Sequence, residues 1–317
     1  MVWRRDTPAL APRHGPLPSD PAGLTVNTVA TQGLLYEQVD RRSLLFVAIT
    51  LVLLILPLWL SLPGWLVAPW LLASTLFCFS ACIINHNHVH TPVFRSTHLN
   101  RLFAIVLSLA RGHTSSGVIV AHNLNHHHYN GAEGDWIATR FAGHGRGAGR
   151  LLRYIVFATL SMARGRSRPD APCLPPGEMR QLLLQRVCLV LFILILLAVS
   201  GLIVLLFVVL PWLLAVAMLV GVNLLQHDGC DPRSQYNHSR NFLGRLGNWF
   251  FFNNGYHTIH HMQPCLHWSR LPAQHRQQVA PHADASLQCP SILHFLAVNY
   301  LWPGAVAADA PTSAGEG

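Results

Sequence analysis

Three histidines in the C-terminal part of the chain, His257, His260 and His261, have the spacing of a metal-binding helix face. Residues at i, i+3 and i+4 lie on one side of an α-helix, so the three imidazoles are predicted to converge one turn apart. Imidazole nitrogens bind zinc, copper, iron and nickel. The simpler alternative is a polar helix that happens to be rich in histidine, and two further clusters argue against it.

Those clusters repeat the spacing. His86 and His90 lie four residues apart, as do His122 and His126, so each pair is predicted to share a helix face. His127 would be rotated by about 140° from His122 on an α-helix, and it therefore has to reach a second metal or another side of the site. A single histidine at the end of an apolar run completes a set of nine candidate ligands, too many for one metal and about right for two: His86, His90, His122, His126, His127, His227, His257, His260 and His261.

The ligand type narrows the choice of metal. Structural zinc sites usually have four ligands, commonly including cysteine, and none of the seven cysteines lies at ligand spacing with these histidines. A dinuclear site built only from histidine, with open positions, favours redox iron and oxygen chemistry. Ligand histidines also need hydrogen-bond acceptors that fix their tautomers. The polar residues close enough in sequence to serve are Asp135, Asp228, Asp231 and Asn254.

Two apolar runs without formally charged residues, 44–84 and 187–225, must position these clusters. Each is too long for one membrane span, which needs about 20 helical residues. Pro63 and Gly64 break the first run, and Ser200 and Gly201 are the preferred break of the second, with Pro211 as the alternative. The sequence therefore predicts spans at about 44–62, 65–84, 182–200 and 202–225, arranged as two hairpins.

The remaining segments are polar. We expect a disordered Pro-rich leader at 1–25, one domain over 26–302, and a disordered tail at 303–317. The segments 99–111 and 150–164 are apolar with arginine at their ends, which predicts helices lying in the membrane interface.

The basic residues give the expected orientation. All 22 are arginines, and none lies in either hairpin turn. The positive-inside rule then places both termini and every histidine cluster in the cytoplasm. The use of arginine alone indicates a GC-rich genome and hence a bacterial inner membrane. A nucleic-acid partner is rejected, because the arginines flank apolar runs and form no patch on a soluble domain.

The combined pattern resembles the three histidine boxes of the membrane fatty acid desaturase and hydroxylase superfamily. The matching motifs are His86-x3-His90, His122-x3-His126-His127 and His257-x2-His260-His261. Asn223-x3-His227 is similar to the additional element of this superfamily, in which the histidine binds iron and the asparagine holds a water. Residues 253–256, 268–272 and 135–136 are similar to the surroundings of the boxes. The resemblance covers about 40–275. It departs in the first box, where some members have four intervening residues, and in the extra histidines His88 and His128.

The resemblance implies an all-α integral membrane protein with four transmembrane helices in two hairpins and a cytosolic helical cap that carries the boxes. It implies two iron ions held by histidine, O2 as co-substrate, and desaturation of a fatty acyl chain at unactivated C–H bonds. The same motifs fit a fatty acid hydroxylase, a decarboxylase that forms terminal alkenes, or an acetylenase.

The expected partners follow from the same reaction. They are the lipid bilayer, a fatty acyl substrate and, for the acyl form, acyl carrier protein or CoA. Because the sequence holds no cytochrome-b5 signature, iron–sulfur cysteine set or dinucleotide loop, we expect an external ferredoxin or rubredoxin-like donor with its reductase. A membrane metal transporter is the remote alternative, disfavoured because the apolar runs lack Asp, Glu, Arg and His within their spans.

Overall fold

The two apolar runs form long helices in the computed structural model, which describes residues 33–145 and 147–302. Four helical stretches are long and apolar enough to cross a membrane: Gln38–Leu58, Gly64–His90, Pro176–Ser200 and Leu205–His227. The prediction of four apolar membrane-spanning helices is therefore confirmed at the level of length and composition. The predicted leader at 1–25 and tail at 303–317 lie outside the described residues.

The helix ends differ from the predicted bounds for local reasons. The first stretch ends in a 3-10 turn around Pro57, which has no N–H to continue the α-helical bonds. The second and fourth continue past the predicted ends at 84 and 225, so His86, His90 and His227 belong to the membrane helices themselves. Pro211 lies in the first turn of a helix and breaks nothing. The second apolar run breaks at Gly201, the preferred of the two predicted positions, where the φ of 64° suits glycine.

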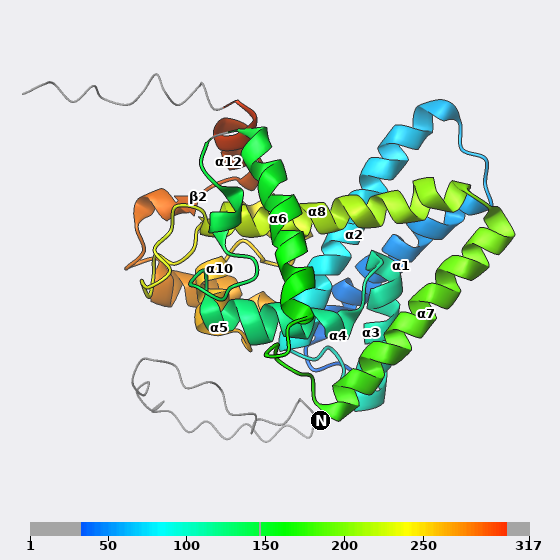
Figure 1. Cartoon of the computed structure of the whole chain (residues 1–317), viewed down its shortest axis with the longest axis horizontal. Helices are drawn as coiled ribbons and strands as arrows, with labels where there is room; N and C mark the ends of the chain where they lie inside the picture. The colour runs from blue at the N-terminus through cyan, green and yellow to red at the C-terminus, as the bar shows by residue number, and fades with distance from the viewer. Residues whose placement is uncertain (1–32, 146, 303–317) are drawn as a thin grey trace, which may run out of the picture.

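The elements of these four stretches are η1 (Gln38–Asp40), α1 (Arg41–Ile55), η2 (Leu56–Leu58), α2 (Gly64–His90), α7 (Pro176–Ser200), η5 (Leu205–Val209) and α8 (Leu210–His227). Between them lie α3 (Thr97–Arg111), α4 (Ser115–Val118), η3 (Ile119–His126), α5 (His127–Tyr129), η4 (Thr139–Ala142) and α6 (Ala148–Arg166). In Figure 1, α6 runs steeply across α8, against which it packs.

Helix α3 forms over the segment 99–111, whose position in the membrane interface stays a prediction. It packs against α2 and α7, and Arg111 at its end is fully buried. The Arg111 guanidinium donates to the carbonyl of Thr114 (2.9 Å) and contacts His113, so protein groups replace lipid headgroups as its partners. The following stretch, Ser115–Tyr129, is bent by 84° relative to α3, and by length and composition the two together qualify as a broken span or a re-entrant loop.

A glycine permits this bend. Gly112 has a φ of 76°, and a Cβ built on it would lie 2.4 Å from the Trp212 ring of α8. We expect Gly112→Ala to lower the free energy of unfolding by roughly 2–4 kcal/mol, through left-handed backbone strain and overpacking. Thermal unfolding in detergent measures the change. Gly149→Ala is the matched control, because no atom lies within 4 Å of its added Cβ and no positive φ is involved. Equal stability of both variants would contradict this account of the bend.

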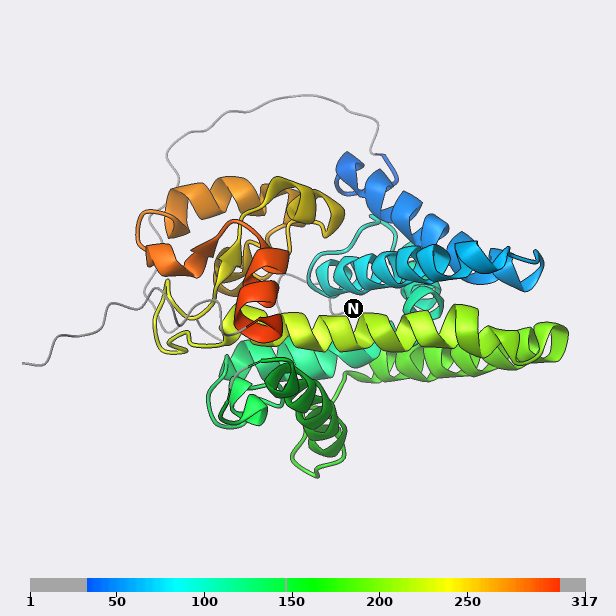
Figure 2. The same ribbon diagram turned by 90° about the horizontal axis from the view of Figure 1, so that it is seen from above.

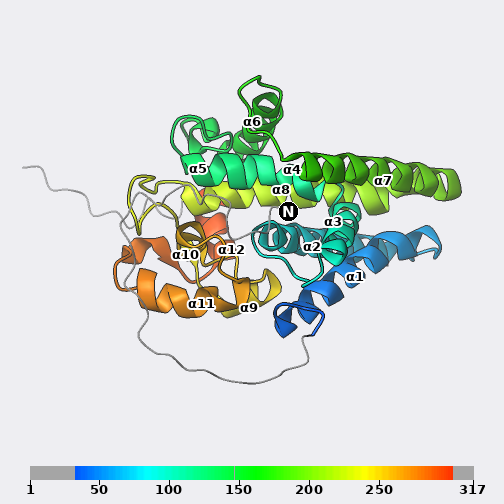
Figure 3. The same ribbon diagram turned by 90° about the horizontal axis from the view of Figure 1, so that it is seen from below.

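The C-terminal segment after α8 is built from short elements: β1 (Asn241–Phe242), α9 (Arg245–Phe250), α10 (His257–Met262), η6 (Trp268–Arg270), α11 (Leu271–Gln274), η7 (His275–Val279), η8 (Ala285–Leu287), β2 (Gln288–Cys289), α12 (Ile292–Leu296) and η9 (Ala297–Leu301). The strands β1 and β2 pair in parallel, with Asn241 opposite Gln288, which is a small departure from an all-α fold. Figures 2 and 3 show this segment gathered at one end of the long helices.

Aromatic packing holds the C-terminal segment there. Phe252 is fully buried and meets Phe46 of α1 edge to face, with ring centroids 5.1 Å apart. Phe251 meets Phe79 of α2 at 4.8 Å. Such pairs add about 0.5–1.5 kcal/mol each beyond the burial of apolar area. The C-terminal segment is thereby docked on α1 and on α2, which carries the first histidine cluster.

Candidate metal centre

The structure brings the nine predicted histidines together in two adjacent groups. Within each group the candidate ligand nitrogens all lie within 4.8 Å of one another. The first group has five members: His86, His90, His122, His127 and His260. The second has four: His126, His227, His257 and His261. Both groups combine residues from the membrane helices, the η3–α5 segment and α10, so the C-terminal segment folds back onto the middle of the chain.

The middle cluster is divided differently from the prediction. On an α-helix His122 and His126 would share a face, but η3 is a π-helix, in which the backbone bonds run from i to i+5. This wider turn brings the Nε2 atoms of His122 and His127 to 3.0 Å, in the five-histidine group. His126 turns to the four-histidine group instead.

The third cluster is also shared between the groups. Helix α10 lies between them, and the rotation of about 100° between consecutive residues directs His260 and His261 to different groups. His257 stays with His261, one turn away, and their Nε2 atoms are 3.1 Å apart. The three imidazoles were expected to converge on one metal. Instead, His260 belongs to the five-histidine group, and His257 and His261 belong to the four-histidine group.

The spacing of the nitrogens fits a bound cation. His257 Nε2 lies 2.9 Å from His227 Nε2 and 3.1 Å from His261 Nε2. A neutral imidazole nitrogen carries one proton or one lone pair, so it cannot satisfy two such partners by hydrogen bonding. Two nitrogens bound at right angles about 2.1 Å from one metal ion lie about 3.0 Å from each other. A cation shared by the three rings therefore accounts for contacts that hydrogen bonds cannot.

The five-histidine group shows the same features. His127 Nε2 lies 3.0 Å from His122 Nε2 and 3.2 Å from His260 Nε2. The Nε2 atoms of His90, in this group, and of His126, in the other, are buried without a hydrogen-bond partner. Buried nitrogens of this kind are costly unless a ligand binds them. All-histidine donor sets suit iron, copper or zinc, so the residues present fit the iron that the sequence predicts.

Asp135 orients one of the ligands. Its Oδ2 accepts hydrogen bonds from His126 Nδ1 (2.9 Å) and from the backbone of Gly131 (2.7 Å), and its Oδ1 accepts from the backbone of Ile137 (2.9 Å). Burial raises the pKa of Asp135, but His126 and the backbone donors outweigh burial and bring the pKa below its usual value. The carboxylate therefore holds the His126 proton on Nδ1 and leaves Nε2 free to face the group.

The other predicted acceptors have different partners. Asp228 binds Arg150 and accepts from the Tyr300 hydroxyl (2.6 Å), linking α6, α8 and η9. Asp231 is exposed and accepts from the backbone of Arg233 (3.0 Å). Asn254 acts through its carbonyl, which accepts from Gln226 Nε2 at 3.0 Å. Asp228 and Asp231 follow the end of α8 and Asn254 precedes α10, and the hydrogen bonds described for the three residues go to partners other than the ligand rings.

His227 is oriented by a group that side-chain patterns do not reveal. Its Nδ1 donates to the backbone carbonyl of His238 (3.1 Å), which leaves Nε2 for the four-histidine group. Asn223, one turn earlier, donates through Nδ2 to the Tyr154 hydroxyl (2.6 Å) and to the Ile137 carbonyl (3.0 Å). Its role in holding a water remains a prediction.

The two extra histidines of the first and second boxes, His88 and His128, lie outside both groups. His128 is exposed on α5. His88 is buried on α2 and packs edge to face with Phe103, with centroids 5.2 Å apart.

Comparison with known proteins agrees with this geometry. The model of the family described as Fatty acid desaturase matches residues 63–290, which include both groups of histidines. The chain belongs to the fatty acid desaturase family. A search of curated proteins returned no significant match. Membership makes this protein an oxidoreductase of the desaturase and hydroxylase type, in a family known for using iron.

Burial keeps the box histidines of this desaturase-family protein in their ligand form. In the C-terminal box, burial and then the neighbouring imidazoles lower the pKa of His257, His260 and His261 well below the ordinary value. Metal ligation requires neutral imidazole. The folded protein therefore presents these nitrogens unprotonated at neutral pH.

The same shifts predict an acid sensitivity. The unfolded chain binds protons at these histidines below a pH of about 6.5, whereas the folded chain does not, so the stability of the metal-free protein falls as pH drops below that value. We expect a loss on the order of 2 kcal/mol per pH unit. Thermal unfolding between pH 8 and pH 5 measures it. His261→Ala should flatten the dependence and the exposed His128→Ala should not; a stability that rises on acidification would refute the assignment.

Proposed function

We propose that this chain is an O2-dependent di-iron enzyme that desaturates a fatty acyl chain by removing hydrogens from unactivated C–H bonds. The observation that carries the proposal is the pair of adjacent all-histidine groups, with five and four members, at the ends of the apolar helices. Bound iron would supply the redox chemistry with O2. The five-histidine group would hold one ion and the four-histidine group the other.

The chain supports this reaction through position and burial. Helices α2 and α8 end in ligand histidines, so an acyl chain entering from the bilayer would reach the centre while its head group stays in water. Desaturation consumes one O2, two electrons and two protons. The acyl chain loses two hydrogens and two waters form. The electrons require an external carrier, for which we propose a ferredoxin or rubredoxin-like protein with its reductase.

The orientation belongs to the same proposal. The arginines flanking the apolar helices favour two hairpins, with both termini, the metal centre and the cap of short C-terminal elements on the cytoplasmic side of a bacterial inner membrane. From that side the enzyme would meet its carrier and an acyl chain presented as free acid, lipid, CoA ester or acyl carrier protein.

Lipid and hydrocarbon analysis by gas chromatography–mass spectrometry tests the proposal. A host expressing the chain should accumulate acyl chains with a new double bond, and a host expressing His261→Ala should not. A hydroxy acid, a terminal alkene or an acetylenic product would assign one of the alternative reactions on the same centre. Transport of metal ions by the His261→Ala variant, together with no oxidised product from either host, would support a transporter and contradict an enzyme.

A further inference from the structure

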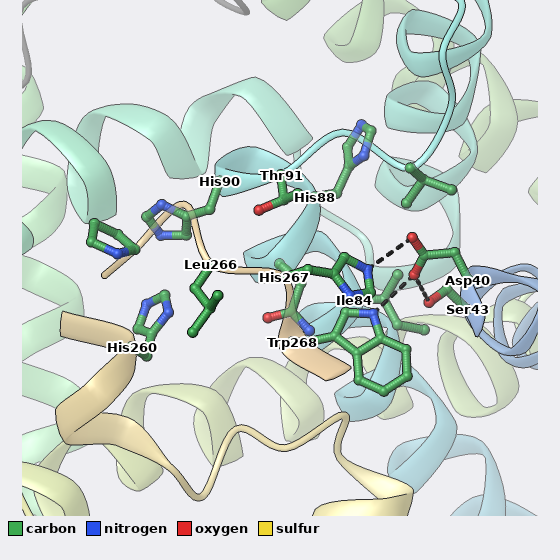
Figure 4. Close-up of a pocket in the computed structure, with 13 residues that line it drawn as sticks. Asp40, Ser43, Ile84, His88, His90, Thr91, His260, Leu266, His267 and Trp268 are labelled. Carbon is green, nitrogen blue, oxygen red and sulfur yellow. Dashed lines mark hydrogen bonds and ion pairs between the residues drawn. The ribbon is translucent and has the colours of Figure 1, made fainter. Parts of the chain in front are cut away.

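A small polar cavity lies beside the five-histidine group (Figure 4). His90 and His260 lie at one end of it, and Asp40 and His267 lie at the other. Its volume is about 10 Å³, near the minimum that holds one water molecule. The cavity is therefore too small for an acyl chain, but a water in it would stand between the metal centre and a titratable pair.

That pair joins segments far apart in the chain. Asp40 Oδ2 accepts from His267 Nε2 at 3.1 Å, although 227 residues separate the two. Its Oδ1 accepts from Trp268 Nε1 (2.9 Å) and Ser43 Oγ (3.0 Å). Asp40 is 1% exposed and His267 is 7% exposed. Burying a charged carboxylate costs free energy unless hydrogen-bond donors stabilise it, and Asp40 has three such donors.

The far side of the pair leads to solvent. Glu37, three residues before Asp40, is ion-paired with the exposed Arg270, three residues after His267. His267 Nδ1 also bonds Ser269 Oγ (2.8 Å), so the ring connects the half-buried Ser269 to the Asp40 carboxylate.

Two further ionisable groups that interact with Asp40 are Arg42 on α1 and His88 on α2. The Arg42 guanidinium lies over the rings of Phe252 and Trp268, 4.5 and 4.6 Å from their centroids.

We propose that Asp40 and His267 form a proton relay that passes solvent protons through the one-water cavity to the metal centre. The inference rests on the proposed function, since reduction of O2 with two electrons from the carrier and two hydrogens from the acyl chain requires two solvent protons to form two waters. His267 takes up a proton at Nδ1 from the Ser269 side as its Nε2 passes a proton to Asp40, and Asp40 gives a proton to the cavity water. No bond other than O–H and N–H is made or broken.

Asp40→Asn in the full-length iron-loaded enzyme tests the relay. The amide keeps the shape and one acceptor but cannot carry a proton, and loss of a proton-transfer group costs about 10²–10⁴-fold in rate. We expect unchanged iron content, product formation at least about tenfold lower, more H2O2 released per O2 consumed, and partial recovery with formic acid as a small diffusible acid. Asp231→Asn, an exposed carboxylate away from the cavity, should behave as the unaltered enzyme.

The controls separate a relay from a structural role. Ser43→Ala removes one hydrogen bond from Asp40 but leaves the proton-carrying pair, so a structural role predicts comparable losses in Ser43→Ala and Asp40→Asn, whereas a relay predicts the larger loss in Asp40→Asn. If Asp40→Asn does not fold, His267→Gln takes its place with the same readouts. Unaltered coupling of O2 to product in the relay variant would overturn the relay and leave the proposed function intact. An unaltered enzyme that holds iron but forms no oxidised product would instead overturn the proposed function.

Discussion

Replacing His261 by alanine is expected to reduce product formation more than about a hundredfold, because loss of a partner behind a metal ligand already costs about 10–100-fold. His261 is a member of the four-histidine group, and its Nε2 lies 3.1 Å from that of His257. Its ring also lies 4.4 Å from that of His127, at the boundary with the other group. The substitution leaves three ligands in its group, so metal content should fall towards the one ion of the five-histidine group.

His128→Ala is the matched control for that variant. His128 neighbours His127 in sequence but is exposed and belongs to neither group. Elemental analysis and product assays on the two purified variants give the comparison. Equal metal content and equal activity in His261→Ala and His128→Ala would show that the four-histidine group does not bind metal.

Asp135→Asn is expected to lower activity or metal affinity about 10–100-fold without unfolding the protein. The carboxylate accepts from His126 Nδ1 and from the backbone N–H groups of Gly131 and Ile137. An amide offers one acceptor oxygen and two N–H donors. Its NH2 group must therefore face at least one of the three N–H groups that donate to the carboxylate. His126 would then lose the bond that fixes its tautomer, and its Nε2 would no longer be held towards the four-histidine group.

Titration of the metal-free variant with ferrous ion, followed by product assays, measures this effect. Asp231→Asn serves as the control, because that carboxylate is exposed and contacts only its own turn among the described residues. A normal metal affinity and rate in Asp135→Asn would mean that the position of His126 does not depend on this hydrogen bond.

The parts of the structure that follow from local patterns could be predicted from the sequence. Charge-free apolar runs, interrupted at Gly64 and Gly201, specify four membrane-length helices. Both the apolar run and the glycine that interrupts it can be read within a single stretch of sequence. Histidine pairs at i and i+4, such as His86 with His90 and His257 with His261, fell within single groups as helical periodicity requires.

The parts that depend on tertiary contacts could not be predicted. Nothing in the residue types of 119–126 distinguishes a π-helix from an α-helix, yet this choice assigns His126 and His127 to different groups. The acceptor for His227 is a backbone carbonyl, which carries no side-chain signature. Arg111 was expected at the lipid headgroups, but the bend after α3 buries it among protein partners. The Asp40–His267 pair requires the two ends of the domain to meet.

The metal content of the purified protein tests the central claim most directly. Protein from iron-supplied cells, purified without oxygen, should contain about two irons per chain, one for each histidine group. On addition of a chemical reductant and an acyl substrate it should consume O2. Protein that holds zinc in place of iron under these conditions, and consumes no O2, would contradict the assignment of a di-iron oxidative centre.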